Sequence, residues 1–103
     1  MIILHRTRSV VSTNLGKALV HAHEVAAYLK EKTKKDVTVQ MPVGGTWCQI
    51  RWSIQFADLA DYDKWTAAFV TDRYYMDLLS SSHDLFIEGS ATDEIWRVMD
   101  RKP

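Results

Sequence analysis

Several features are scarce in this chain of 103 residues, and each scarcity excludes a class of protein. Cys48 is the single cysteine, so one chain forms neither an internal disulfide nor a cysteine-based metal site. No run approaches the roughly 18 apolar residues of a membrane-spanning helix. The start, MIILHRTRSVV, lacks the long apolar region and small-residue cleavage site of a signal peptide. We therefore expect a cytoplasmic protein with no membrane partner.

Net charge is also absent, because 13 basic residues balance 13 acidic residues. A neutral chain offers no basic surface to nucleic acid, so nucleic acid is not an expected partner. Glycine is sparse, and no glycine-rich phosphate-binding loop is present. Length and composition predict one globular domain over residues 1–103.

What the sequence does contain is a clear strand pattern from Thr46 to Phe56, TWCQIRWSIQF. Apolar and polar residues alternate with period two, which is typical of a half-buried strand. Residues 37–41 alternate in the same way, and Gly44-Gly45 between them predicts a two-residue hairpin turn. That turn sets a register in which three apolar pairs share one face: Met41 with Cys48, Val39 with Ile50, and Val37 with Trp52.

The remaining elements follow from periodicity and from helix-capping signals. A strand over Ile2–Val11 precedes a helix over Leu15–Lys32, for which Ser12-Thr13-Asn14 supplies N-cap candidates. A helical region over Asp58–Ser82 is expected to break at Val70-Thr71-Asp72. The last expected pieces are a short strand over Leu85–Glu88 and an extended segment over Ile95–Met99.

This order predicts an α+β, ferredoxin-like βαββαβ sandwich. A four-stranded antiparallel sheet carries both helical regions on one face, with the first strand and the Thr46 strand at its centre. The opposite face is left bare, and we expect Trp47 and part of the first strand to lie on it. A second copy of the chain is the simplest cover for such a face, so we expect a homodimer.

Three segments, GKALVHAHEVAAYLKEK, FADLADYDKWTAAFVTDRYYMDLL and HDLFIEGSATDEIWRVM, resemble small bacterial members of the dimeric α/β-barrel superfamily. That superfamily includes antibiotic-biosynthesis monooxygenase-like, NIPSNAP-like and stress-responsive barrel proteins. The resemblance implies a homodimer whose two sheets face each other as a barrel, with a cavity in each subunit between sheet and helices. The histidine and asparagine of the haem-degrading branch are not matched, because the place near Leu78 is apolar and no asparagine precedes Asn14.

Three residues are candidates for catalysis. Cofactor-free monooxygenases of the superfamily use an asparagine and tryptophan pair with a tyrosine. Trp65 and either Tyr74 or Tyr75 could stand in for the last two, but no asparagine follows Asn14. His5 lies beside two arginines on the first strand, where a histidine can act as acid or base. The alternatives are a structurally hydrogen-bonded His5 beneath a dimer interface, and Trp65 and Tyr75 as plain core.

Four further residues are candidates for ligand binding: Trp47, Gln49, Arg51 and Tyr74. Arg51 lies on the polar hairpin face, where it could hold a carboxylate with two parallel hydrogen bonds. Its alternative role is an ion pair at an interface, for example with Glu88 or Asp93.

His21 and His23 form a His-x-His pair, but on a helix they point about 200° apart and cannot chelate one metal ion. No metal or other cofactor is therefore expected. The function expected first is a homodimer that binds a small molecule in its cavity. One alternative is a cofactor-independent monooxygenase or isomerase acting on an aromatic or polyketide-like substrate. The other is an oligomeric protein-interaction scaffold.

Overall fold

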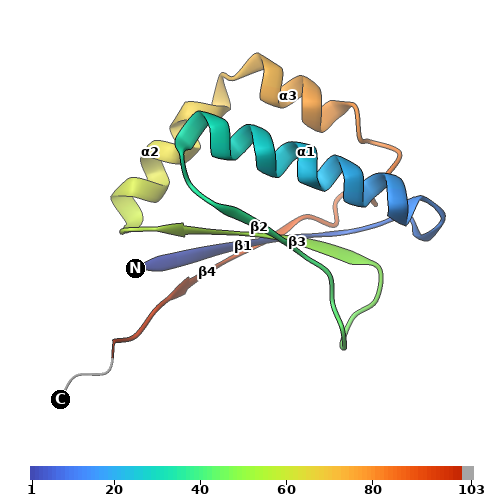
Figure 1. Ribbon diagram of the computed structural model, residues 1–103, viewed down its shortest axis with the longest axis horizontal. Coiled ribbons are helices and arrows are strands. Elements are labelled where there is room, and N and C mark those ends of the chain that lie inside the picture. The colour runs from blue at the N-terminus through green and yellow to red at the C-terminus, as the bar shows by residue number, and fades with distance from the viewer. Residues whose placement is uncertain (101–103) are drawn as a thin grey trace.

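The computed structural model describes residues 1–100 and has the predicted α+β architecture. All strand pairs are antiparallel, and the sheet order is β2-β3-β1-β4, so β1 and β3 are central as expected. The helices cover one face of the sheet and leave the other bare (Figure 1). The elements are β1 (Ile2–Ser9), η1 (Ser12–Asn14), α1 (Leu15–Thr33), β2 (Val37–Gln40), β3 (Gln49–Phe56), α2 (Leu59–Val70), α3 (Arg73–Ser80) and β4 (Thr92–Arg97).

The register predicted for the β2–β3 hairpin is wrong by two residues. Val37 pairs with Ile54 and Val39 pairs with Trp52, so the apolar face is preserved while every partner is displaced. No two-residue turn forms at Gly44-Gly45, and residues 41–48 make a long loop instead. Cys48 closes that loop at φ 55°, a left-handed conformation that ends the alternation before β3 begins.

Helix α1 lies close to the sheet because its inward face carries small residues. Ala18 and Ala22 are fully buried, and the Ala22 carbonyl accepts a hydrogen bond from Trp52 Nε1 over 3.1 Å. The predicted side-chain cap is wrong, because Asn14 makes no capping bond and instead donates to the Asp84 carbonyl. At the other end Lys34 adopts φ 62° and donates its N–H to the Lys30 carbonyl, which stops the helix.

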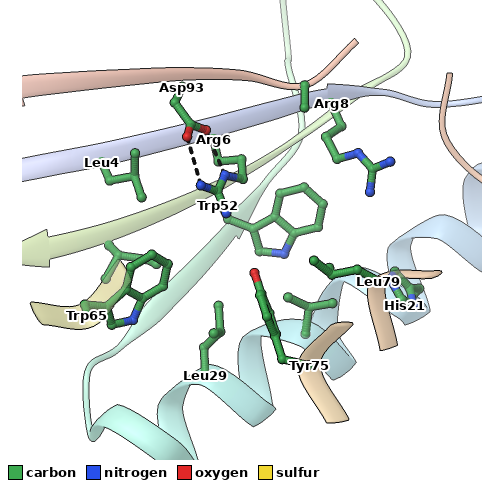
Figure 2. Close-up of a pocket in the computed structure, with 13 residues that line it drawn as sticks. Leu4, Arg6, Arg8, His21, Leu29, Trp52, Trp65, Tyr75, Leu79 and Asp93 are labelled. Carbon is green, nitrogen blue, oxygen red and sulfur yellow. Dashed lines mark hydrogen bonds and ion pairs between the residues drawn. The ribbon is translucent and has the colours of Figure 1, made fainter. Parts of the chain in front are cut away.

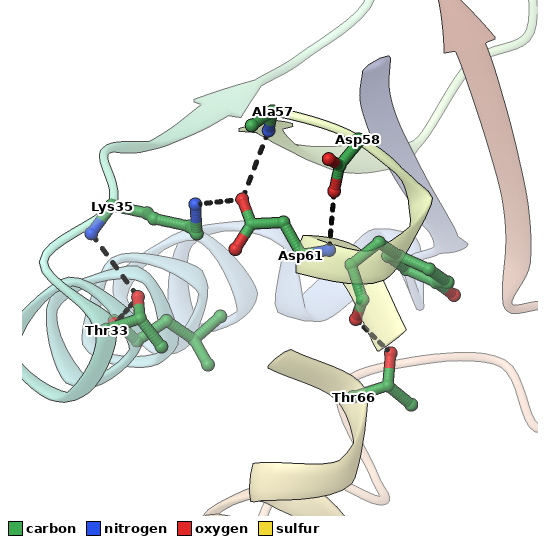
Figure 3. Close-up of polar contacts among 8 residues, drawn as sticks. Thr33, Lys35, Ala57, Asp58, Asp61 and Thr66 are labelled. Carbon is green, nitrogen blue, oxygen red and sulfur yellow. Dashed lines mark hydrogen bonds and ion pairs between the residues drawn. The ribbon is translucent and has the colours of Figure 1, made fainter. Parts of the chain in front are cut away.

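The predicted break in the second helical region is confirmed: α2 ends at Val70 and α3 begins at Arg73. Asp72 caps α3, because its side chain accepts the Tyr75 N–H over 3.0 Å. At the start of α2, Asp58 accepts the Asp61 N–H (Figure 3). Asp61 Oδ2 in turn accepts from Lys35 Nζ over 2.7 Å and from the Ala57 N–H over 3.1 Å, which ties α2 to the segment after α1.

The strand predicted over Leu85–Glu88 does not form. Phe86 makes one isolated bridge to Val10, while the extended segment expected at Ile95–Met99 lies at Thr92–Arg97 as β4. Every residue of β4 is exposed. Within residues 1–100, no helix has the length and apolar character needed to cross a bilayer.

Candidate functional site

A cavity of about 480 Å³ lies between the helix-covered face of the sheet and the helices (Figure 2). That volume is within the roughly 300–1,000 Å³ typical of small-molecule sites. Strands β1 and β3 form its floor, while α1, α2 and α3 supply its walls. The lining residues are Leu4, Arg6, Arg8, His21, Val25, Leu29, Trp52, Ile54, Trp65, Tyr75, Leu79, Ala91 and Asp93.

Arg6 projects from the central strand into this cavity and is neutralised there. Its guanidinium donates two parallel hydrogen bonds to Asp93, over 2.7 Å from Nε and 2.8 Å from Nη2. Asp93 lies opposite Arg6 on β4, so the sheet register itself creates this pair. The hydrogen bond to Asp93 raises the pKa of Arg6. Arg6 is therefore already matched to an anion inside the chain.

Arg8 leaves β1 on the same face two residues later, and its environment differs. Its guanidinium carbon lies 4.2 Å above the Phe86 ring centroid, which is a cation–π contact. The Nε atom is buried, and no residue in the described part of the chain accepts a hydrogen bond from it. Burial, followed by the nearby Arg6 charge, lowers the pKa of Arg8. The cavity therefore holds a cation that lacks an anion.

Two residues that line the cavity each carry a buried polar atom without a partner within residues 1–100: His21 Nε2 and Trp65 Nε1. Both side chains are 6% exposed, so water at the surface does not satisfy these atoms. Burial lowers the pKa of His21, which keeps its imidazole neutral at physiological pH. Buried polar groups normally have partners, and three such exceptions around one cavity mark a candidate binding site.

Tyr75 extends its hydroxyl from α3 into the space below Arg6 and Trp52 (Figure 2). Burial raises the pKa of this phenol, so it stays protonated at neutral pH. A neutral phenol donates a hydrogen bond and does not act as a base. Trp65 lines the same cavity, so the structure brings together two of the three catalytic candidates.

His5, the third catalytic candidate, lies on the opposite, bare face of the sheet. Its Nδ1 is 2.7 Å from Ser53 Oγ, which also accepts a hydrogen bond from Gln40 Nε2 over 2.9 Å. Arg51 is on the same face and donates from Nε to Thr7 Oγ1 over 3.1 Å. His5 and Arg51 therefore do not share the cavity of Trp65 and Tyr75 within one chain.

The other predicted ligand-binding residues are also outside the cavity. Gln49 lines a separate hollow together with Arg51. Trp47 was expected on the bare face but lies in the 41–48 loop and is 78% exposed. Tyr74 is 63% exposed, and its ring centroid is 4.8 Å from that of Tyr28 on the outer side of the helices.

His21 and His23 diverge as the helical geometry requires, since His21 is buried and His23 is exposed. Within residues 1–100, no group of three or more histidine, cysteine, aspartate or glutamate side chains is arranged to hold a metal ion.

Arg6, Arg8, His21 and Asp93 were not predicted as site residues. The sequence did contain a signal for Arg6 and Arg8. Side chains alternate between the two faces of a strand, and this places both arginines on the same face as Ile2, Leu4 and Val10. Two charges on the apolar face of a central strand require a partner or a cavity. No comparable pattern marked Asp93, which the β1–β4 register brings to Arg6.

No protein-family model matches the sequence, and no curated protein matches it significantly. Solved structures do match its fold. A NIPSNAP domain protein from Burkholderia xenovorans has a TM-score of 0.82 at 9% identity, over 100% of this chain and 99% of that one. A NIPSNAP family protein from Agrobacterium tumefaciens has a TM-score of 0.80 at 14% identity, over 99% and 96%. The chain therefore shares the fold of these two proteins.

The same fold extends to a second group. A candidate antibiotic biosynthesis monooxygenase from Deinococcus radiodurans has a TM-score of 0.72 at 8% identity, over 100% of this chain and 97% of that one. The family resemblance found in the sequence is thus confirmed at the level of fold. Identities this low carry no reaction with them, so function is argued from the cavity.

Proposed function

We propose that this protein is a homodimer that binds a small organic molecule in the cavity between sheet and helices of each subunit. The observation that carries the proposal is the gathering of three unpartnered buried polar atoms, Arg8 Nε, His21 Nε2 and Trp65 Nε1, around one cavity. Leaving a buried donor unsatisfied costs about 1–3 kcal/mol. A ligand that supplies the missing partners recovers that cost, whereas a plain structural core gains nothing from this arrangement.

The homodimer is supported by the bare face of the sheet. Trp96 on β4 lies opposite Ile3 on that face and is 59% exposed. A large aromatic side chain left exposed on a sheet face is the kind of surface that a partner subunit covers.

Native mass spectrometry of freshly purified protein tests ligand binding and assembly together. We expect a dimer mass carrying a small-molecule increment. Ala91→Trp should remove the increment, because Ala91 lines the cavity and is exposed, so an indole there obstructs the cavity without straining the core. Ala67→Trp on the exposed side of α2 is the matched control. An increment that survives in Ala91→Trp contradicts the cavity proposal, and a dimer that binds no small molecule favours the scaffold function.

The interface has its own test. Trp96→Asp places a carboxylate on the bare face beside Ile3, and we expect light scattering to report a monomer. Trp47→Asp in the 41–48 loop is the control and should remain dimeric. A dimer in Trp96→Asp, or a monomer in the wild type, contradicts the assignment of this face.

A second candidate function is a cofactor-independent monooxygenase or isomerase acting on an aromatic or polyketide-like substrate. It is favoured by Trp65 and Tyr75 lining the same cavity. Each side chain carries a hydrogen-bond donor, the Trp65 Nε1–H and the Tyr75 hydroxyl, and donors of this kind stabilise developing enolate oxygens. Oxygen uptake and product analysis over a panel of hydroxylated aromatics, with Tyr75→Phe as the test variant, check this function. Turnover that Tyr75→Phe leaves unchanged contradicts the assigned role.

A further inference from the structure

We propose that the ligand of this cavity is an organic monocarboxylate with an apolar, planar body and a second acceptor oxygen, and that Arg8 binds its carboxylate. The inference rests on the proposed small-molecule function and names the chemical class of the ligand. It follows from the charge inside the cavity, the position of the unpartnered donors and the surface between them.

The charge of the lining residues selects a monoanion. Arg6 and Asp93 cancel in a bidentate ion pair, which leaves Arg8 as the uncompensated charge among the lining side chains. Burial holds His21 neutral and Tyr75 protonated, as the directions of their pKa shifts indicate. One ligand carboxylate would bring the net charge of the cavity, ligand included, to zero. A phosphate dianion would instead introduce an excess negative charge beside Asp93.

The geometry around Arg8 fits a carboxylate. The guanidinium lies over Phe86, and the His21 ring is 6.0 Å from the same ring in an edge contact, so both polar groups border one apolar surface. Arginine is always protonated and presents a planar fork of donors that matches a carboxylate. Because Arg8 Nε has no acceptor within residues 1–100, a carboxylate that engages the Arg8 guanidinium breaks no hydrogen bond of that atom described in the chain.

The second acceptor is indicated by Trp65, which lies on the other side of the cavity from Arg8 (Figure 2). Indole Nε1–H donates and never accepts, so its partner must be an oxygen or another acceptor. A ketone, ester or ether oxygen at that position satisfies Trp65 without adding charge. Trp52 and Tyr75 lie between the two ends, and their rings provide apolar surface for a planar body.

Isothermal titration calorimetry with matched probes tests the carboxylate. The probes are benzoate, 1-naphthoate and indole-3-acetate, each paired with its primary amide, and 1-naphthyl phosphate as the dianion. We expect at least one acid to bind about tenfold or more tightly than its amide, as a charge-assisted hydrogen bond predicts. Arg8→Met should abolish that preference and leave amide binding unchanged. Arg8→Lys should restore part of it.

Arg51→Met on the bare sheet face is the control and should retain the full preference. Thermal unfolding of each variant confirms that it is folded. Acids and amides that bind equally overturn this inference while leaving the small-molecule function standing. A preference that survives in Arg8→Met, or tighter binding of the phosphate than of 1-naphthoate, also overturns it. If no probe binds and native mass spectrometry finds no ligand, the proposed function itself is wrong.

The second acceptor has a separate test. The compound 3-benzoylpropionate carries a ketone that 4-phenylbutyrate lacks, and the two acids are otherwise matched. We expect the ketone to bind several-fold more tightly to the wild type, and Trp65→Phe to equalise the two affinities. Equal affinities in the wild type contradict the role assigned to Trp65 and leave the carboxylate assignment to be judged by Arg8 alone.

Discussion

The Tyr28 hydroxyl donates a hydrogen bond to Asp72 Oδ2 across 2.5 Å, and this contact fastens α1 to the break between α2 and α3. The other oxygen of the same carboxylate caps α3 by accepting the Tyr75 N–H. The hydrogen bond to Asp72 raises the pKa of Tyr28 to about 12, because removing its proton would break the bond and place two anions together. One carboxylate thus sets the position of α3, and with it the Tyr75 side of the cavity.

Tyr28→Phe removes this hydroxyl while keeping the aromatic contacts of the ring. We expect the melting temperature to fall by several degrees, since the half-buried Asp72 loses a charge-assisted hydrogen bond. Calorimetry measures the change. Tyr74→Phe on the exposed side of α3 is the control and should be neutral. Equal melting temperatures in wild type and Tyr28→Phe contradict a locking role for this bond.

The contact between Lys35 and Asp61 predicts a stability change at acidic pH. The hydrogen bond from Lys35 lowers the pKa of Asp61 from its ordinary 3.8. The stabilisation is therefore complete above about pH 3.8 and is lost as pH falls from there towards the lower folded-state pKa. Asp61→Asn should melt below the wild type at neutral pH, and the difference should shrink as the pH falls below 3.8. A difference that does not shrink argues against the ionic contribution, and Asp63→Asn provides the exposed control.

His21 predicts a second pH effect, at higher pH. Burial lowers the pKa of His21 below its ordinary 6.5, so the folded chain resists protonation that the unfolded chain accepts. Stability is then complete above about pH 6.5 and falls as pH drops through that value towards the folded-state pKa. Urea unfolding at about pH 8 and pH 5 should show a smaller acid loss in His21→Gln than in the wild type. Exposed His23→Gln should match the wild type, and a His21→Gln variant as pH-sensitive as the wild type contradicts the assignment.

The close approach of α1 to the sheet predicts intolerance of bulk at Ala18, which is fully buried against β3. Ala18→Leu should lower the free energy of unfolding by about 1–3 kcal/mol, because added methylenes displace packed neighbours. Ala27→Leu, at an exposed position of the same helix, should change it by less than about 0.5 kcal/mol. Denaturant titration measures the free energy of unfolding of both variants. Equal changes in the two variants would mean that α1 moves away from the sheet to accommodate the added side-chain volume.

The fold was predictable where a pattern has one physical meaning. Period two assigned the faces of β3, and Thr71-Asp72 marked the break between helices, because aspartate satisfies free N–H groups at a helix start. The hairpin register was not predictable from the same pattern. A shift of two residues preserves every face, so alternation alone cannot choose between the predicted and observed partners. The left-handed backbone at Cys48 decided the loop, and cysteine gives no signal for that conformation.

The site was predictable in part for a similar reason. Trp65 and Tyr75 lie on inward helical faces, so spacing places them near the sheet. The sequence analysis emphasised His5. Strand alternation, however, places His5 and Arg6 on opposite faces of the sheet, so His5 points away from the helices. The unmatched charge of Arg8 became visible only when the β1–β4 register assigned Asp93 to Arg6. Which of two neighbouring arginines is neutralised depends on a pairing between residues 87 positions apart.

The four tryptophans fall into two pairs whose fluorescence reports on different parts of the molecule. Trp52 and Trp65 line the cavity and are 5% and 6% exposed, whereas Trp47 and Trp96 are 78% and 59% exposed. Shielded indoles emit at shorter wavelengths than hydrated ones, so the two pairs contribute distinguishable bands. A ligand that fills the cavity changes the short-wavelength emission of Trp52 and Trp65. A subunit that covers the bare sheet face shifts the emission of Trp96 to shorter wavelength. Ligand occupancy and subunit association can thus be followed separately in one unlabelled sample.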